Sequence, residues 1–147
     1  MIFHKSEFIK EDALVIKDSN RALNYGDGFF ETIKIINTKP FNFSAHYVRF
    51  SFACKVLKLK NNETEKSFLS LINKLIEKNK IINGNAKIHV NRSGEGKYLP
   101  VSDSLELLIS INKGSSFAKN TPISLCVFSD EQKTKGKISN IKSVNAL

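Results

Sequence analysis

The order of the apolar patterns along the chain constrains its fold more than any other feature. A β-branched and aromatic run, Phe29 to Ile36, leads into the turn residues Asn37-Thr38-Lys39-Pro40. This pattern predicts a hairpin whose second strand lies around Phe41 to Phe43. Two helical stretches follow, and strand patterns come after them. A hairpin, two helices and then strands predict an α+β domain, a mainly antiparallel sheet with two helices on one face, rather than a doubly wound parallel sheet.

The two helical stretches differ in the signals that define them. Ser44 is predicted as the N-cap of a helix that runs to about Leu59, because its hydroxyl can accept from an unpaired amide of the first turn. The second helix follows Asn61-Asn62-Glu63-Thr64, and its apolar residues recur with the 3.6-residue period that places them on one face. These residues are Phe68, Leu69, Ile72, Leu75 and Ile76.

Four more segments have the composition of strands. A short apolar run, Ala13 to Ile16, precedes the turn Asp18-Ser19-Asn20. The others lie beyond the helices, at Ala86 to Asn91, Leu105 to Asn112 and Ile123 to Phe128. With Phe29 to Ile36, they supply the strands of the predicted sheet.

Length and composition set wide bounds. The 147 residues suffice for one domain with a single core. No apolar run approaches the length of a membrane span, and the first residues lack the apolar stretch of a signal peptide. Cys54 and Cys126 form no CxxC pattern, and the three histidines share no metal-ligand spacing. We therefore expect a reduced, cytoplasmic setting, no metal and no membrane partner.

The net charge of +9 raises the alternative of a nucleic-acid-binding domain. Of the 23 basic residues, only Arg21, Arg49 and Arg92 are arginines, and the lysines are spread along the chain. Nucleic-acid readers usually cluster their basic residues and use arginine for bidentate contacts. Only Lys133 to Lys137 resembles a patch. We therefore expect no nucleic-acid partner.

Two segments in the first half of the chain carry candidate site residues. In Tyr25 to Lys34, two glycines precede the strand, and alternation places Phe30, Thr32 and Lys34 on one face, which suits a pocket wall. A tight turn before a core strand is the simpler interpretation of this segment. His46 and Arg49 are three residues apart at the start of the first helix and so share a face. An arginine there can bind a phosphate through two parallel hydrogen bonds, although a surface arginine is the simpler interpretation.

Two further segments complete the set. The glycine-interrupted loop from Asn91 to Pro100 carries Arg92, which is either a ligand for a substrate carboxylate or a charge at the rim. Lys142 lies between apolar residues in the low-charge octet Asn140 to Leu147. A desolvated lysine amine can act as a nucleophile, whereas an exposed one is only a solubilising charge.

In this order, the four segments resemble the class IV aminotransferase family, the fold-type IV pyridoxal-phosphate enzymes. Arg21 with Tyr25-Gly26-Asp27-Gly28-Phe29-Phe30-Glu31-Thr32 is similar to the first strand motif of the family. His46-x-x-Arg49 resembles the helix with a phosphate-binding arginine. Asn140-Ile141-Lys142-Ser143-Val144-Asn145 resembles the segment that presents the cofactor lysine. The resemblance covers essentially the whole chain.

The resemblance implies a role for each candidate residue. Lys142 would form an aldimine with pyridoxal 5′-phosphate and then act as general acid and base, and Arg49 would hold the phosphate. Tyr25 and Phe30 would line the substrate pocket, with Arg92 or its loop near the substrate carboxylate. The substrate would be a small amino compound, and the enzyme a homodimer. Glu31 we interpret as structural or interfacial and His46 as orienting.

Within the family, the lysine segment and the Arg92 loop resemble those of aminodeoxychorismate lyases. We therefore favour elimination of the 4-amino-4-deoxychorismate lyase type over a branched-chain or D-amino-acid aminotransferase. Phe30 stands where D-amino-acid aminotransferases usually have tyrosine. Enzymes of this family continue past the lysine into a second domain, so we expect residues 1–147 to be the N-terminal domain, without the C-terminal one. A non-catalytic dimerisation remnant is the other alternative.

Overall fold

The computed structural model describes residues 1–114, 122–127 and 135–144. Its helices and strands, in chain order, are β1 (Ile2–His4), β2 (Glu7–Ile9), the 3-10 helix η1 (Glu11–Ala13), α1 (Arg21–Tyr25), β3 (Gly28–Ile36), β4 (Lys39–Pro40), α2 (Phe43–Val56), α3 (Glu65–Lys78), β5 (Gly84–Arg92) and β6 (Leu105–Lys113). Among the described residues, no helix combines the length and the apolarity that crossing a membrane requires.

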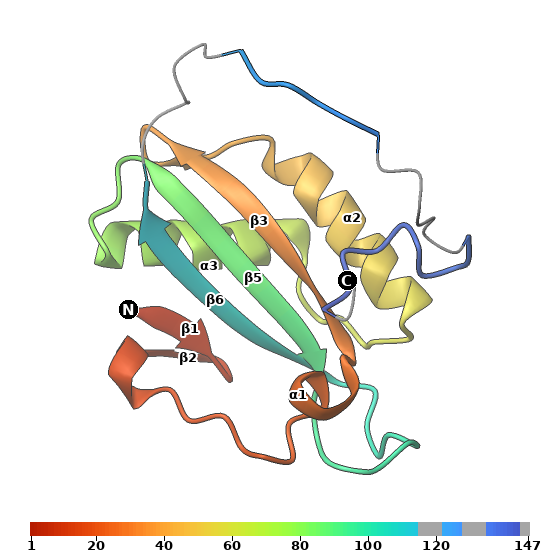
Figure 1. The fold of residues 1–147 in the computed structure, drawn as a ribbon. Coiled ribbons are helices and arrows are strands. Elements are labelled where there is room, and N and C mark those ends of the chain that lie inside the picture. The colour runs from red at the N-terminus through yellow and green to blue at the C-terminus, as the bar shows by residue number, and fades with distance from the viewer. Residues whose placement is uncertain (115–121, 128–134, 145–147) are drawn as a thin grey trace.

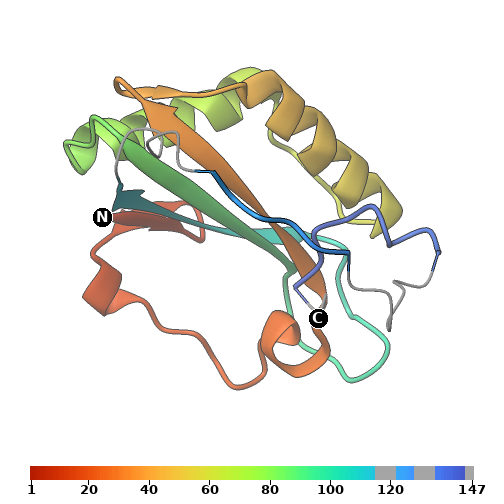
Figure 2. The same cartoon turned by 45° about the horizontal axis from the view of Figure 1, so that its top comes forward.

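The strands form one six-stranded sheet in the order β2-β1-β6-β5-β3-β4. Every pairing between these strands is antiparallel. Helices α2 and α3 cover one face of the sheet, and the segment with α1 passes below the other face (Figures 1 and 2). The predicted fold class, an α+β domain with two helices on one face of an antiparallel sheet, is confirmed.

The core lies between the sheet and these two helices. In β3, the side chains of Phe29 and Ile33 are each 1% exposed, whereas Thr32, which points to the other face, is exposed. This alternation follows from the two-residue period of a strand. Phe29 packs near Phe50 of α2, which in turn packs against Phe68 of α3. The helices therefore bury one face of β3 and leave the other uncovered.

The long patterned elements agree with their sequence predictions. Strands β3, β5 and β6 contain the predicted ranges, apart from shifts of one to a few residues at their ends. Helix α3 buries Phe68, Ile72, Leu75 and Ile76 as its period predicts, and Thr64 and Ser67 form a capping box at its start.

Four local predictions are wrong. Helix α2 begins two residues earlier than expected, with Asn42 rather than Ser44 at the N-cap, in a left-handed conformation, and the Ser44 hydroxyl donates instead to Glu65. The partner strand of the hairpin is only β4, because Phe43 already belongs to α2. Ala13 to Ile16 forms no strand. Of the predicted strand Ile123 to Phe128, residues 123–127 belong to no strand of the described structure, and Phe128 lies outside the described residues.

The pairing of β3 with β5 depends on a glycine at position 28. Gly28 lies opposite Asn91. A Cβ at Gly28 would overlap the carbonyl oxygen of Val90 and lie 3.1 Å from the Cα of Asn91. The close approach of the two strands therefore excludes a side chain at the start of β3.

We expect Gly28→Ala to lower the free energy of unfolding by about 1–3 kcal/mol, because the strands must move apart to fit the methyl group. Urea denaturation followed by circular dichroism measures this change. The matched control is Gly136→Ala, since a Cβ there meets nothing within 4 Å. The control should change stability by less than about 0.5 kcal/mol. Equal effects of the two substitutions would refute the packing argument.

Candidate active site

The segment that carries Lys142 pairs with the free edge of β3. The Phe30 amide donates to the carbonyl of Lys142 at 2.9 Å, and the Val144 amide donates to the carbonyl of Gly28 at 3.1 Å. Between them, Phe29 and Ser143 form an antiparallel bridge. Ile141, 3% exposed, is part of the hydrophobic core and anchors the segment. Residues 141–144 therefore lie beside the start of β3 (Figure 1).

This register decides which way the lysine points. Because Ser143 lies opposite Phe29, Lys142 lies opposite Phe30 and shares its side of the sheet, the side opposite α2 and α3. The Lys142 Nζ atom is 5.0 Å from the centroid of the Phe30 ring. The side chain is exposed, and within the described part of the chain its amine has no carboxylate partner.

The next residue of β3 holds Arg49 on the other side of the sheet. The Glu31 carboxylate is 5% exposed and accepts from Arg49 Nε at 3.0 Å and from Arg49 Nη2 at 2.7 Å. His46 Nδ1 lies 2.8 Å from the same carboxylate and donates to it in the tautomer with the proton on Nδ1. The spacing of His46 and Arg49, one helical turn, brings both onto Glu31.

Electrostatics favours the charged forms of this pair. Burial raises the pKa of Glu31, but the hydrogen bonds and positive charge of Arg49 and His46 outweigh it, so the net pKa lies below the ordinary value. The hydrogen bond to Glu31 likewise raises the pKa of Arg49. The Arg49 side chain remains 54% exposed, and its Nη1 has no hydrogen-bond partner among the described residues. Arg49 is thus a braced guanidinium that can still bind an anion.

Arg92, the last residue of β5, lies elsewhere, in a buried polar network beside the turn that precedes β3. Its side chain is 8% exposed; Nε donates to Asp27 at 3.1 Å, Nη1 to Asp103 at 2.7 Å and Nη2 to the carbonyl of Leu57 at 2.6 Å. Asp27 also accepts from Arg21 Nε at 2.8 Å. A contact between Arg92 and a substrate carboxylate would have to replace one of these bonds. In this structure Arg92 holds the loop.

Tyr25 belongs to this same region. It ends α1, with its ring 4.9 Å from the guanidinium carbon of Arg21 and 6.1 Å from the ring of Tyr98. The Arg21 Nη1 atom donates to the carbonyls of Gly96 and Lys97, so the loop after β5 is held against α1. The structure thus places Lys142 beside Phe30 and Arg49 on Glu31, the next residue of β3, on opposite sides of the sheet. It places Tyr25 and Arg92 around the turn that precedes β3.

Sequence reasoning assigned Glu31 to the face opposite Phe30, which is correct, but it did not identify Glu31 as the partner of Arg49. The signal was present in the strand alternation together with the spacing of His46 and Arg49. The role of Asp27 was also missed. Its two partners, Arg21 and Arg92, lie in different elements, and nothing local to Asp27 indicates that they meet.

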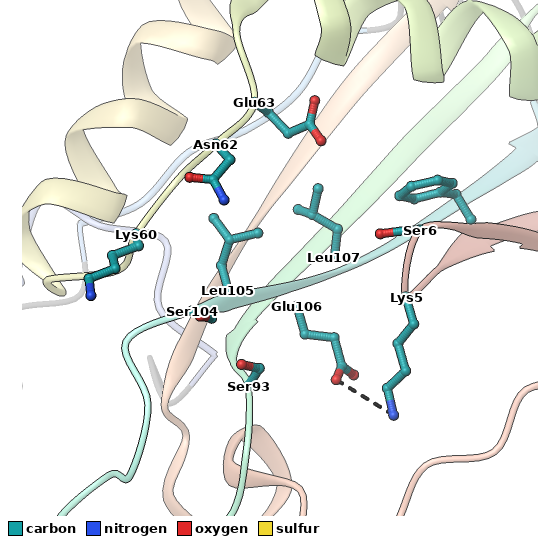
Figure 3. A pocket seen from close by; sticks show the side chains of 11 residues that line it. Lys5, Ser6, Lys60, Asn62, Glu63, Ser93, Ser104, Leu105, Glu106 and Leu107 are labelled. Atoms are coloured by element: carbon teal, nitrogen blue, oxygen red, sulfur yellow. Dashed lines mark ion pairs between the residues drawn. The ribbon is translucent and has the colours of Figure 1, made fainter.

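The cavity in Figure 3 contains none of the predicted site residues. Its volume is about 400 Å³, and Phe3, Leu105 and Leu107 form its apolar wall. Charged and polar side chains lie around it, including Glu63 of the loop between α2 and α3 and the ion pair of Lys5 with Glu106. We place the candidate site at Lys142 and Arg49 instead, because the amine and the guanidinium that are candidates for a nucleophile and an anion-binding group are there. No cluster of described residues could hold a metal ion.

Comparisons with known proteins agree with the geometry. The family model for amino-transferase class IV matches residues 28–147. A D-alanine aminotransferase of Staphylococcus epidermidis is 28% identical over 91 residues, which cover 62% of this chain and 32% of the relative. An aminodeoxychorismate lyase of Bacillus subtilis is 29% identical over 93 residues, 63% of this chain and 32% of the relative. The chain thus matches about a third of the length of these relatives.

A solved structure shows the same fold. A 4-amino-4-deoxychorismate lyase from Legionella pneumophila, described as putative, superposes with a TM-score of 0.80 at 18% identity. The superposition covers 92% of this chain and 50% of the other. At this identity, the likeness concerns the fold alone.

The Glu31 contacts predict a pH-dependent contribution to stability. We expect Glu31→Gln to lower the free energy of unfolding by about 2 kcal/mol near neutral pH, since it removes charge-assisted hydrogen bonds. The folded pKa of Glu31 lies below the ordinary value of 4.5. The contribution should therefore be present above that value and disappear as pH falls through the folded pKa.

Urea denaturation of both proteins across this pH range measures the difference. Glu77→Gln, a change at an exposed residue of α3, is the control and should leave stability unaltered. A difference between wild type and Glu31→Gln that persists unchanged at low pH would contradict the ionic origin of the effect.

Proposed function

Because this chain belongs to the amino-transferase class IV family, we propose that it supplies the lysine and arginine of a pyridoxal-phosphate site. The members of this family are pyridoxal-phosphate-dependent aminotransferases and lyases. One observation carries the proposal. The pairing of residues 142–144 with β3 sets the Lys142 amine over Phe30, and the adjacent Glu31 braces Arg49. A nucleophilic amine and an anion-binding guanidinium are thereby tied to neighbouring residues of one strand.

The residues present fit this cofactor. The phosphate would bind to Arg49, whose Nη1 is available, and the aldehyde carbon would bind Lys142 Nζ, which has no acidic partner among the described residues. When bound, pyridoxal phosphate supplies an electron sink for the bonds around the amino-bearing carbon of the substrate. The ion pair of Arg49 with Glu31 uses Nε and Nη2 and leaves the side chain 54% exposed, and Lys142 forms no ion pair with a carboxylate among the described residues.

The residues of this chain have distinct tasks in the proposed site. Lys142 Nζ would accept a proton from the reacting carbon of the substrate and return it, as a general base and then a general acid. The Phe30 ring centroid lies 5.0 Å from this amine, where the ring would orient the amine and exclude water from one side. Tyr25 would contribute to the wall of the substrate pocket from the end of α1. The Arg92 network would hold the loop that faces the substrate.

For the reaction, we propose elimination of the 4-amino-4-deoxychorismate lyase type on a small amino compound. The similarity to the lyase of Bacillus subtilis supports this choice. The matches to D-alanine aminotransferases support the alternative, an amino-acid aminotransferase.

A second copy of the chain is the proposed partner. The exposed side chains of Val48 and Phe52, one turn apart on α2, form an apolar surface that a dimer could bury.

The lysine assignment predicts one specific site of cofactor attachment. After incubation with pyridoxal phosphate and reduction with borohydride, peptide mass spectrometry should find the added mass on Lys142. Lys142→Ala should abolish this saturable labelling. Lys137→Ala, at an exposed lysine in the same segment, should keep it. Labelling at stoichiometric cofactor that survives in Lys142→Ala would overturn the assignment.

The reaction type predicts whether an amino acceptor is required. A lyase should consume 4-amino-4-deoxychorismate without any 2-oxo acid, whereas an aminotransferase needs a 2-oxo acid to regenerate its cofactor. We expect turnover in the absence of a 2-oxo acid, measured by loss of substrate, and none in Lys142→Ala. Turnover only after addition of a 2-oxo acid would establish the aminotransferase alternative. A stable dimer that takes up no pyridoxal phosphate at saturation would favour the non-catalytic dimerisation remnant.

A further inference from the structure

The face of the sheet opposite α2 and α3 carries a row of side chains that begins at Lys142. Phe30 of β3 lies opposite His89 of β5, and His89 lies opposite Leu108 of β6. Because paired residues point to the same side of a sheet, Lys142, Phe30, His89 and Leu108 form one line across it. The rings of Phe30 and His89 are 6.3 Å apart. The reacting amine therefore stands at one end of a continuous wall.

A second amine approaches the same aromatic ring on the same face of the sheet, from the opposite edge of β3. Lys87 of β5 lies opposite Thr32, and its Nζ is 5.8 Å from the centroid of the Phe30 ring. The corresponding distance for Lys142 Nζ is 5.0 Å. The separation of the two amines therefore cannot exceed the sum of these distances. Both side chains are exposed, so both amines are available to a ligand that covers Phe30.

The charge of these two amines has no acidic counterpart nearby. Among the described residues, neither lysine forms an ion pair. On the uncovered face of β5 and β6, the described carboxylate is Glu106, opposite Asn91, and it is engaged by His4 at 3.0 Å and by Lys5 at 3.7 Å. The pKa of His89 is lowered by burial and further by the positive charge of Lys87. The surface around Phe30 is therefore electropositive.

We propose that Lys87 is a specificity residue that binds the carboxylate of the substrate across the Phe30 ring from Lys142. The inference rests on the proposed function, because it takes Lys142 as the position of the reacting carbon. In 4-amino-4-deoxychorismate the ring carboxylate lies across the ring from the amino-bearing carbon, and in an amino acid it is one bond from that carbon. In either case a single small ligand can approach both amines. The lysine stem is flexible and its ammonium forms charge-assisted hydrogen bonds with carboxylates. A neutral side chain of similar size at position 87 would lose this contact.

The test is a binding measurement that needs neither cofactor nor turnover. Propionate and its neutral isostere propionamide are titrated into ¹⁵N-labelled protein at constant ionic strength, because salt screens exposed charges. The backbone amides of Phe30, Lys87 and His89 report binding. We expect saturable shifts with propionate and none with propionamide. Lys87→Met should weaken propionate binding about tenfold, equivalent to about 1.4 kcal/mol, and Lys87→Arg should largely retain it.

Lys66→Met, the same change at an exposed lysine of α3, is the matched control and should bind propionate as the wild type does. Unchanged propionate affinity in Lys87→Met would overturn the proposal, and so would the absence of saturable shifts in the wild type. Borohydride labelling of Lys142 in Lys87→Met separates this failure from that of the proposed function. Labelling that persists while Lys87→Met binds propionate normally leaves the cofactor site intact and removes only the role of Lys87.

Discussion

Strand β3 is the element on which both the core and the candidate site depend. One of its edges pairs with β5 over eight residue pairs, and the other pairs with residues 142–144 at its start. Its two-residue period sends Phe29 and Ile33 into the core and Phe30 to the uncovered face. A shift of one residue in either pairing would exchange these faces and bury Lys142 under the helices. The glycine at position 28 allows the close approach that fixes the register.

The buried Glu31 carboxylate connects this strand to helix α2. A buried ion pair adds little stability by itself, because desolvation offsets most of the attraction, but removal of one partner leaves a costly buried charge. The contribution of the Glu31–Arg49 ion pair here is to orient the guanidinium of Arg49. Two of the guanidinium nitrogens of Arg49 are held by Glu31, and the remaining part of the guanidinium faces outward. The arginine can thus meet an anion without first losing much side-chain freedom.

Local patterns predicted β3, α3, β5 and β6 because each is long and has a clear period. The three-residue strands β1 and β2 escaped prediction, since β1 is defined by its pairing with β6, about a hundred residues away. Residues 123–127 show the converse, a strand composition that belongs to no strand of the described structure. For the site, residue types and family resemblance indicated Lys142 and Arg49. The register that sets Lys142 over Phe30, and the bonds that commit Arg92 to Asp27 and Asp103, join distant segments and could not be read locally.

The central claim is that Lys142 and Arg49, held by consecutive residues of β3, form one cofactor site. A crystal structure of the protein with pyridoxal phosphate tests it most directly. We expect continuous density from the cofactor to Lys142 Nζ above the Phe30 ring, with the phosphate in hydrogen-bond contact with Arg49. Cofactor density in the cavity beside Leu105 and Leu107, or a Lys142 side chain turned to the helix-covered face, would contradict the account.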